Sequence, residues 1–219
     1  MLRYARHDVL CFFSRLSYSV PNCLKKHLAT LLSAVFHPLL VPSYLAGLVE
    51  LQQATGGSRL WTVVVFTFLL PTGAAMLLLR LGRIDSLEMP RRQQRAWPLG
   101  LAALSFGAGA GWLHWQHAAP ALVVGLAGMA VAVLLTFLIT LRWKISAHGV
   151  GMGGAAGLLL ALYLQHRIGP AWVLVAAGLA AAVGWARLAL RAHTSAQVWA
   201  GLALGVSVAL GCSMVLALG

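Results

Sequence analysis

The sequence predicts an all-α fold, a polytopic membrane bundle of about six or seven transmembrane helices. Of its 219 residues, 60% are hydrophobic and 9% are charged, whereas soluble domains carry about 25% charged residues. Uncharged apolar segments of about 20 residues, the length that crosses a bilayer as a helix, recur along the chain. The polar residues gather in the gaps between these segments, which leaves no room for a sizeable soluble domain.

The formal net charge of +12 would suggest a nucleic-acid partner in a soluble protein. Here the basic residues lie between apolar segments and form no basic surface interleaved with aromatic residues, so we expect no nucleic acid. Anionic lipid surfaces or phosphate groups are the expected partners. The three cysteines show no metal-binding or redox spacing. We expect an integral protein of the bacterial inner (cytoplasmic) membrane, without a cleavable signal peptide.

Residues 1–30 alternate basic and apolar side chains. Two interpretations stay open for them, a basic amphipathic helix on the membrane surface or a flexible basic leader. Residues 31–219 are predicted to form one transmembrane domain.

The expected spans are residues 31–51, 60–79, 99–115, 121–141, 149–164, 170–190 and 196–218. The first contains His37, Pro38 and Pro42, so we expect a kink there. His37 either faces the bundle interior as a functional residue or hydrogen-bonds a neighbouring helix, and we expect the hydrogen bond. The fifth span begins with a glycine-rich run from Gly149 to Gly157, whose small residues would let helices approach closely.

Polar clusters follow the second, fourth and sixth spans, at residues 83–95, 142–148 and 187–193. In an up-and-down bundle these exits lie on one membrane face, so we expect the three clusters to converge. The opposite loops contain few polar residues. Such uneven polarity predicts a site on one face, and by the positive-inside rule that face is cytoplasmic.

The third cluster contains Arg187, Arg191 and His193. Gln197 lies four residues after His193, so on a helix it shares that face and can hydrogen-bond the ring. A histidine held in this way beside two arginines is a candidate nucleophile for phosphoryl chemistry. The alternative is a basic interfacial loop with an incidental histidine.

The second cluster contains Lys144, Ser146 and His148. Ser146 is a good N-cap for the following helix, whose free N–H groups and dipole would attract an anion. His148 is placed where a general acid could reach a leaving-group oxygen, and Lys144 is a further candidate. The alternative is a capped helix start beside an interfacial histidine.

The first cluster contains Arg92 and Arg95, three residues apart and able to share a helix face. Their planar guanidinium groups suit the paired oxygens of a phosphate. Asp85 and Glu88 either hold these arginines or bind a cation that bridges a diphosphate. The alternative is a positively charged loop that sets membrane topology.

Taken together over residues 60–215, the three clusters resemble the motifs of the type 2 phosphatidic acid phosphatase superfamily. Those membrane enzymes hydrolyse lipid phosphates and diphosphates through a phosphohistidine. The matching positions are Arg95 before Pro98, Ser146-x-His148, and Arg187-x5-His193. The chain departs from the motifs at Glu88, where the family has lysine, at Ile145 and Ala147, and at Gln197, where it has aspartate.

The resemblance implies that His193 attacks phosphorus, His148 protonates the leaving oxygen, and water then releases phosphate, without metal or cofactor. Arg92, Arg95, Ser146 and Arg187 would hold the phosphate. The implied substrates are isoprenoid diphosphates such as undecaprenyl diphosphate, phosphatidic acid and phosphatidylglycerophosphate, with a preference for the first. Many family members act on the outer membrane face, which leaves the orientation open.

Gln197 can orient the histidine but cannot supply the aspartate's charge, whose loss costs about four orders of magnitude in turnover in an analogous triad. Either another carboxylate helps, with Asp85 the first candidate, or the enzyme is slow, or the site only binds. In the last case the chain is a lipid-phosphate-binding or structural subunit of a membrane complex. The expected protein partners are other subunits of such a complex or further copies of this chain. A transporter would need ionisable residues at mid-membrane depth, which the long spans lack apart from His37.

Overall fold

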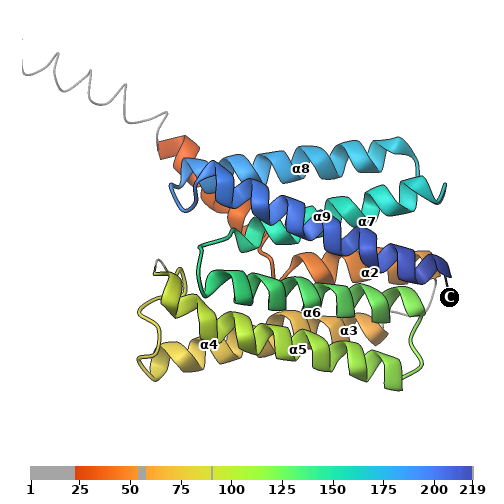
Figure 1. Cartoon of the computed structure of the whole chain (residues 1–219), viewed down its shortest axis with the longest axis horizontal. Coiled ribbons are helices and arrows are strands. Elements are labelled where there is room, and N and C mark those ends of the chain that lie inside the picture. Colours follow the sequence, from red (N-terminus) through yellow and green to blue (C-terminus); the bar gives the residue numbers. More distant parts are fainter. Residues whose placement is uncertain (1–22, 54–57, 90, 219) are drawn as a thin grey trace, which may run out of the picture.

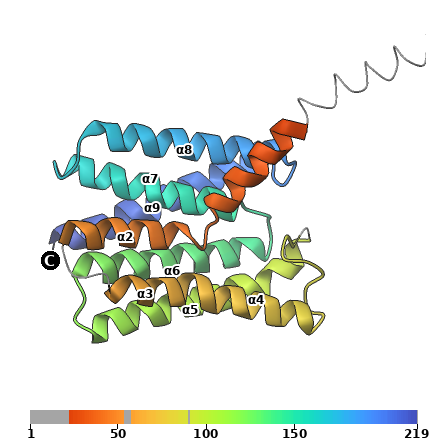
Figure 2. The same ribbon diagram turned by 180° about the vertical axis from the view of Figure 1, so that it is seen from behind.

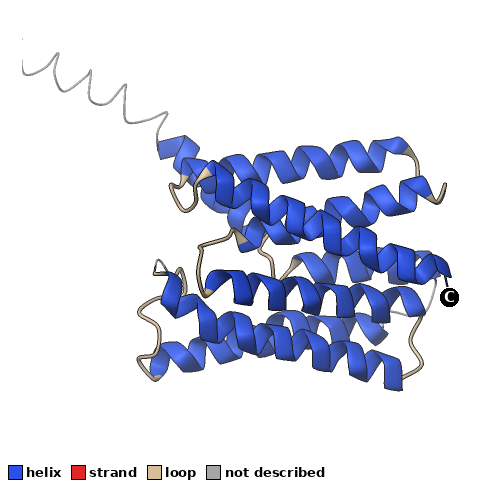
Figure 3. Ribbon diagram, viewed as in Figure 1, coloured by secondary structure: helices blue, strands red, loops and turns tan. Residues whose placement is uncertain are grey.

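The computed structural model describes residues 23–53, 58–89 and 91–218. Figure 3 shows that helices and connecting loops make up this part of the chain, which confirms the all-α prediction. Most of the predicted leader, residues 1–22, lies outside the described residues, while residues 23–35 are helical. The α-helices that follow are α2 (Val41–Gln53), α3 (Ser58–Val64), α4 (Leu70–Arg80), α5 (Ala96–Trp115), α6 (Pro120–Thr140), α7 (Ala147–Leu164), α8 (Pro170–Ala189) and α9 (Ser195–Leu218).

Among the described residues, five helices are long and apolar enough to cross a membrane. They cover Arg59–Arg80, Pro120–Thr140, Ala147–Leu164, Pro170–Ala189 and Ser195–Val215. The transmembrane character predicted from the sequence therefore has direct support in the helices themselves. The expected third span corresponds to α5, which is 20 residues long but carries several glycines and His114.

The prediction of one continuous first span over residues 31–51 is wrong. Residues 23–35 form a helix, residues 36–40 leave it, and α2 begins at Val41. Pro38 explains the break, because proline has no N–H to donate and pushes the preceding residue out of the helical region. With 13 residues, α2 is about 20 Å long, shorter than the hydrocarbon core of about 30 Å. The proline pair produces a complete break instead of the expected kink.

The span Arg59–Arg80 stays continuous through a π-helical turn at Val65–Leu69. Pro71 cannot donate a backbone hydrogen bond, and the N–H of Leu70 bonds five residues back, to the carbonyl of Val65. The carbonyl of Phe66 thereby loses its usual partner. The hydroxyl of Ser105, on α5, donates to it at 2.6 Å. The bulge thus fixes α5 against this span.

The closest helix packing joins α7 to α9. A Cβ on Gly153 would meet the backbone of Leu202, and a Cβ on Gly205 would meet the backbone of Val150 and Gly154. The two helices therefore touch backbone to backbone along the glycine-rich run, as the small residues of the fifth expected span predict. The contact extends to the start of α7, where Gly149 lies against the carbonyl of Val198.

The bundle lies between α8 at one edge and α5 with the α3–α4 span at the other, with α6 between them (Figure 1). The connections α4–α5, α6–α7 and α8–α9 all lie at the same end. Seen from behind, α2 runs through the middle of the bundle, and helical residues 23–35 lie at that same end (Figure 2). The three polar clusters are therefore gathered at one end, as the span order predicts.

We predict that Gly205→Ala lowers the thermal midpoint of the detergent-purified protein by several degrees. The new methyl group would press on the backbone of α7, and such overpacking costs about 1–3 kcal/mol. Gly178→Ala is the matched control, since a Cβ there meets nothing within 4 Å. Equal midpoints for the two variants, measured by tryptophan fluorescence, would refute the close α7–α9 packing.

Candidate functional site

The candidate site lies where the three connections meet. The backbone N–H of Ser146, before α7, donates to the carbonyl of Gln197 in the first turn of α9 at 3.2 Å. This bond joins the second polar cluster to the third. The charges of Arg95, Lys144 and Arg187 all act on His193, which brings the first cluster to the same place.

His193 lies just before α9 and is 8% exposed. Gln197 Oε1 is 3.0 Å from its Nδ1, so the predicted pairing of these two residues is present. The same Oε1 accepts the N–H of Thr194 at 3.3 Å, and the N–H of Gln197 faces Thr194 Oγ1 at 3.4 Å. These reciprocal bonds form a capping box, Thr194-x-x-Gln197, at the start of α9. Gln197 therefore caps the helix and holds the histidine at once.

The capping box determines which nitrogen of His193 is free. A backbone N–H can only donate, so the Gln197 atom that faces Thr194 is its oxygen. That oxygen must therefore accept a hydrogen bond from Nδ1–H of His193. The neutral ring then carries its proton on Nδ1 and leaves Nε2 with a free lone pair. This is the tautomer that a nucleophilic histidine needs.

The surroundings of His193 keep the ring neutral. Burial is the main cause that lowers its pKa to about 4, and the hydrogen bond to Gln197 opposes this effect. The positive charges of Arg95, Arg187 and Lys144 lower the pKa further. At neutral pH the ring is therefore unprotonated and able to attack an electrophile.

The three cations whose charges act on His193, namely Arg95, Lys144 and Arg187, are half-buried. Arg95, in the 3₁₀ turn Arg92–Arg95, donates from Nε to the carbonyl of Met89 at 2.9 Å. Arg187 Nε is buried and finds no acceptor among the described residues. Burial and then the charges of Arg95 and Arg187 lower the pKa of Lys144. Such a group of cations is a receptor for an anion.

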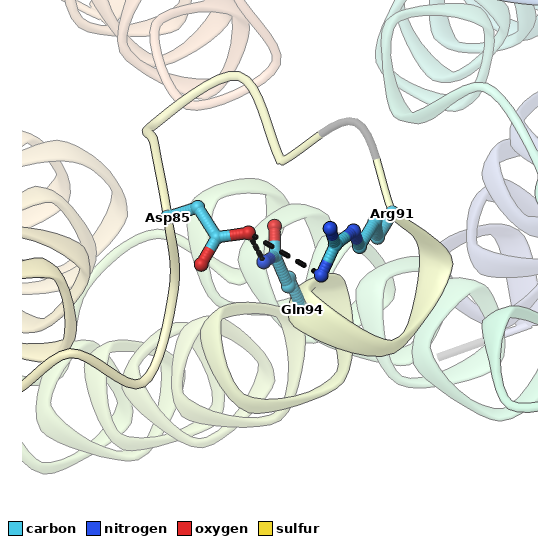
Figure 4. A network of polar contacts seen from close by, with 3 residues as sticks. All are labelled: Asp85, Arg91 and Gln94. Carbon is cyan, nitrogen blue, oxygen red and sulfur yellow. Dashed lines mark hydrogen bonds and ion pairs between the residues drawn. The ribbon is translucent and has the colours of Figure 1, made fainter.

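Acidic residues lie at the margin of the site. Asp85 accepts a hydrogen bond from Gln94 and pairs with Arg91 at 3.7 Å in an exposed loop (Figure 4). The charge of Glu88 acts on Arg187. Within residues 23–53, 58–89 and 91–218, no carboxylate lies within ion-pair distance of Arg95, Lys144 or Arg187. The structure thus brings Asp85 to Arg91 and Gln94, not to His193.

Two further predicted residues have other contacts. Arg92 donates to the carbonyl of Leu141 at the end of α6, and so ties the 3₁₀ turn to that helix. Arg191 is exposed and has a φ of 52°. It follows the end of α8, where the N–H of Ala192 bonds the carbonyl of Arg187, as in a Schellman cap. Neither charge is among those that act on His193.

Ser146 is the N-cap of α7, as predicted: its Oγ accepts the N–H of Gly149 at 3.2 Å. It is fully buried, so its structural work is to hold the start of α7. His148 lies in the first turn of α7, and Nε2 donates to the carbonyl of Ser33 at 3.0 Å. The N–H of Ser146, two residues before His148, bonds the carbonyl of Gln197, whose side chain holds His193, so the two histidines belong to one site.

His37 lies beside His148, in this site. Its ring meets that of His148 edge to face, with centroids 5.4 Å apart. Its Nδ1 accepts the local N–H of Leu39, so the expected hydrogen bond to a neighbouring helix is replaced by a ring contact. Burial and then the charge of Arg187 lower the pKa of His37. The signal in the sequence was a histidine beside a helix-breaking proline.

An apolar cavity of about 100 Å³ adjoins the site between α2, α5, α6 and α7. Its lining includes Pro38, which follows His37, and Ala147, which lies between Ser146 and His148. Leu99, Phe106 and Val150 continue the lining into the bundle. The cavity therefore runs from the polar end into the apolar interior.

No protein-family model, no curated protein and no solved structure matches this chain. In the described part of the chain, no group of three or more His, Cys, Asp or Glu side chains is placed to hold a metal ion.

We predict that the stability of the protein falls as the pH is lowered from about 6.5 to 4, and falls less in His193→Gln. Between these pH values His193 is protonated in the unfolded chain but unprotonated in the folded protein, because its pKa is lower in the folded state. The free energy of unfolding therefore decreases as the pH is lowered. The difference between the variants should reach up to about 3 kcal/mol. Parallel curves of thermal midpoint against pH would show that His193 titrates normally.

Proposed function

We propose that the chain is an integral-membrane lipid phosphatase, a divergent member of the type 2 phosphatidic acid phosphatase superfamily, working through a phosphohistidine. The observation that carries the proposal is the state of His193. Its Nδ1 is held by Gln197, its Nε2 has no hydrogen-bond partner among the described residues, and the charges of three cations act on it. A neutral nucleophile inside an anion-binding group of cations suits phosphoryl transfer.

Phosphate recognition would fall to Arg95, Lys144 and Arg187. Arg187 supports this role because its buried Nε lacks a protein acceptor among the described residues. A phosphoryl oxygen would satisfy that donor, and the combined charge would stabilise the transferring group. Arg92 would not contact the phosphate directly; its bond to the end of α6 would hold the turn that carries Arg95 in place.

The reaction would proceed in two displacements. Nε2 of His193 attacks phosphorus, the P–N bond forms and the P–O bond to the lipid breaks. His148, which takes up a proton on Nδ1 once the negatively charged phosphate is bound, gives that proton to the departing oxygen. Water then attacks the phosphohistidine, the P–N bond breaks, and His148 takes the proton that water loses. The enzyme returns to its starting state, and one water has been consumed for each phosphate released.

A lipid substrate is favoured by the position of the site. The polar end of the bundle would lie at the membrane face, and the apolar cavity beside it would receive the first part of a hydrocarbon chain. In this proposal α5 also spans the bilayer and α2 lies within it, which gives six or seven membrane segments. The headgroup is an isoprenoid diphosphate, phosphatidic acid or phosphatidylglycerophosphate, in the bacterial inner membrane, with the site on the cytoplasmic face.

One observation favours a second function. Gln197 completes the capping box of α9, so its presence has a structural reason independent of catalysis. A site with a neutral partner for His193 would still bind a lipid phosphate. The chain would then be a lipid-phosphate-binding subunit of a membrane complex.

The first test is phosphate release by the purified protein in detergent, with each of the three lipids as substrate. We expect release that disappears in His193→Ala and persists in His114→Ala. His114 is the matched control because it is exposed in the last turn of α5, at the opposite end of the bundle. Acid-labile phosphate trapped on the wild type but not on His193→Ala would identify the intermediate. If the folded wild type releases no phosphate from any of the three lipids, the phosphatase proposal is rejected in favour of the lipid-phosphate-binding subunit.

Replacing Gln197 tests whether the partner of His193 needs a negative charge for catalysis. Gln197→Glu keeps the shape and both oxygen bonds while adding the missing charge, which stabilises the imidazolium that forms on reaction. We expect turnover to rise by about ten-fold or more, since loss of the corresponding charge in a related triad costs about 10⁴. Gln197→Leu, which removes both bonds, should lower it. A glutamate variant slower than wild type would mean that the charge has no catalytic role.

A further inference from the structure

The break at residues 36–40 brings a fourth segment to the site. Residues 23–35 end beside the first turn of α7, and the chain turns at Pro38 before α2 begins. The turn packs against α7 at Gly151, where an added Cβ would be in contact with Pro38 Cα, at 3.4 Å. Gly151 follows His148 by three residues, so the segment lies along one face of α7.

This segment holds His148 in two ways. The carbonyl of Ser33 lies 3.0 Å from Nε2 of His148, and a carbonyl can only accept, so Nε2 carries a proton. The ring of His37 meets the same imidazole edge to face, at an interplanar angle of 83°. Aromatic pairs favour this geometry, which fixes the ring plane as well as its tautomer.

His37 is itself held. Its Nδ1 accepts the N–H of Leu39 at 3.3 Å, so in the neutral ring the proton lies on Nε2. His37 is therefore fixed by its own turn before it contacts His148. The charge of Arg187 also acts on His37, which places the segment within the cationic part of the site.

The consequence for His148 is chemical. With Nε2–H committed to Ser33, only Nδ1 is left to exchange a proton with a substrate. We infer that His37 is a positioning residue: with Ser33 it holds His148 so that Nδ1 serves the leaving-group oxygen. The catalytic part of this inference rests on the proposed phosphatase function, and the positioning of His148 stands on the geometry alone.

Leaving-group chemistry distinguishes this role from a merely structural one. Phosphatidic acid releases a strongly basic alkoxide that needs a proton, whereas p-nitrophenyl phosphate releases a weakly basic phenolate that does not. In the first turnover, which forms the phosphohistidine, His37→Ala should slow release of the alcohol from phosphatidic acid by about 10- to 100-fold, a fraction of what a general acid contributes. Release of p-nitrophenolate in the same step should be nearly unchanged. His37→Phe, which keeps a ring against His148, should restore most of the rate. Equal losses on both substrates would overturn the inference.

A double-mutant cycle tests whether His37 acts through His148. His148→Ala should show the same dependence on the leaving group, and His37→Ala should add little in that background. Additive losses would mean that His37 acts independently of His148, and would refute the positioning role.

Nitrogen NMR of ring-labelled histidines tests the positioning without turnover. In the wild type His148, assigned by its absence from His148→Ala, should show a protonated Nε2 and an unprotonated Nδ1. In His37→Ala the two tautomers should mix. An unchanged His148 signal in His37→Ala would overturn the inference even in an active enzyme. The expected tautomer change in a protein that releases no phosphate would keep the positioning and reject the phosphatase proposal.

Discussion

The structure depends on the backbone contact between α7 and α9. Glycines on both helices remove the side chains that would otherwise separate them, and the closest approach continues to the start of α7. There the carbonyl of Gln197 accepts the N–H of Ser146. The same few residues that pack the bundle therefore fix the distance between His148, on α7, and the capping box that holds His193. Membrane helices lack a strong hydrophobic drive to associate, so such close packing is also what holds them together.

The parts of the site that could be predicted from the sequence follow local rules. Gln197 pairs with His193, as their spacing predicts, but His193 precedes α9, and it is the capping box with Thr194 that turns the Gln197 side chain back toward it. Ser146 caps α7 because serine suits that position. The meeting of the three clusters follows from counting spans, since alternate connections must lie on one side. Apolar length likewise indicates membrane helices, which five helices of the described chain bear out.

What could not be predicted depends on contacts between distant residues. The residues near Pro38 predict a break in the helix, but they do not predict that the break places Ser33 and His37 against His148. Asp85 was a reasonable partner for His193 by charge alone, yet its loop turns it toward Arg91 and Gln94. Arg92 and Arg95 are three residues apart, but a long side chain can reach a carbonyl of another helix, and Arg92 does. Long-range geometry, rather than residue type, separates the site residues from their neighbours.

The neutral side chain of Gln197 matters for the net charge of the site as well as for the orientation of His193. Arg95, Lys144 and Arg187 lie around His193 without a paired carboxylate among the described residues. An aspartate there would neutralise part of the field that attracts a phosphate, while a glutamine leaves it intact and still orients the ring. In the proposed phosphatase, a glutamine rather than an aspartate would therefore strengthen binding of a highly charged anion and weaken stabilisation of the imidazolium. That balance would suit a diphosphate headgroup better than a phosphate monoester, because the phosphate leaving group of a diphosphate needs less help from the nucleophile's partner.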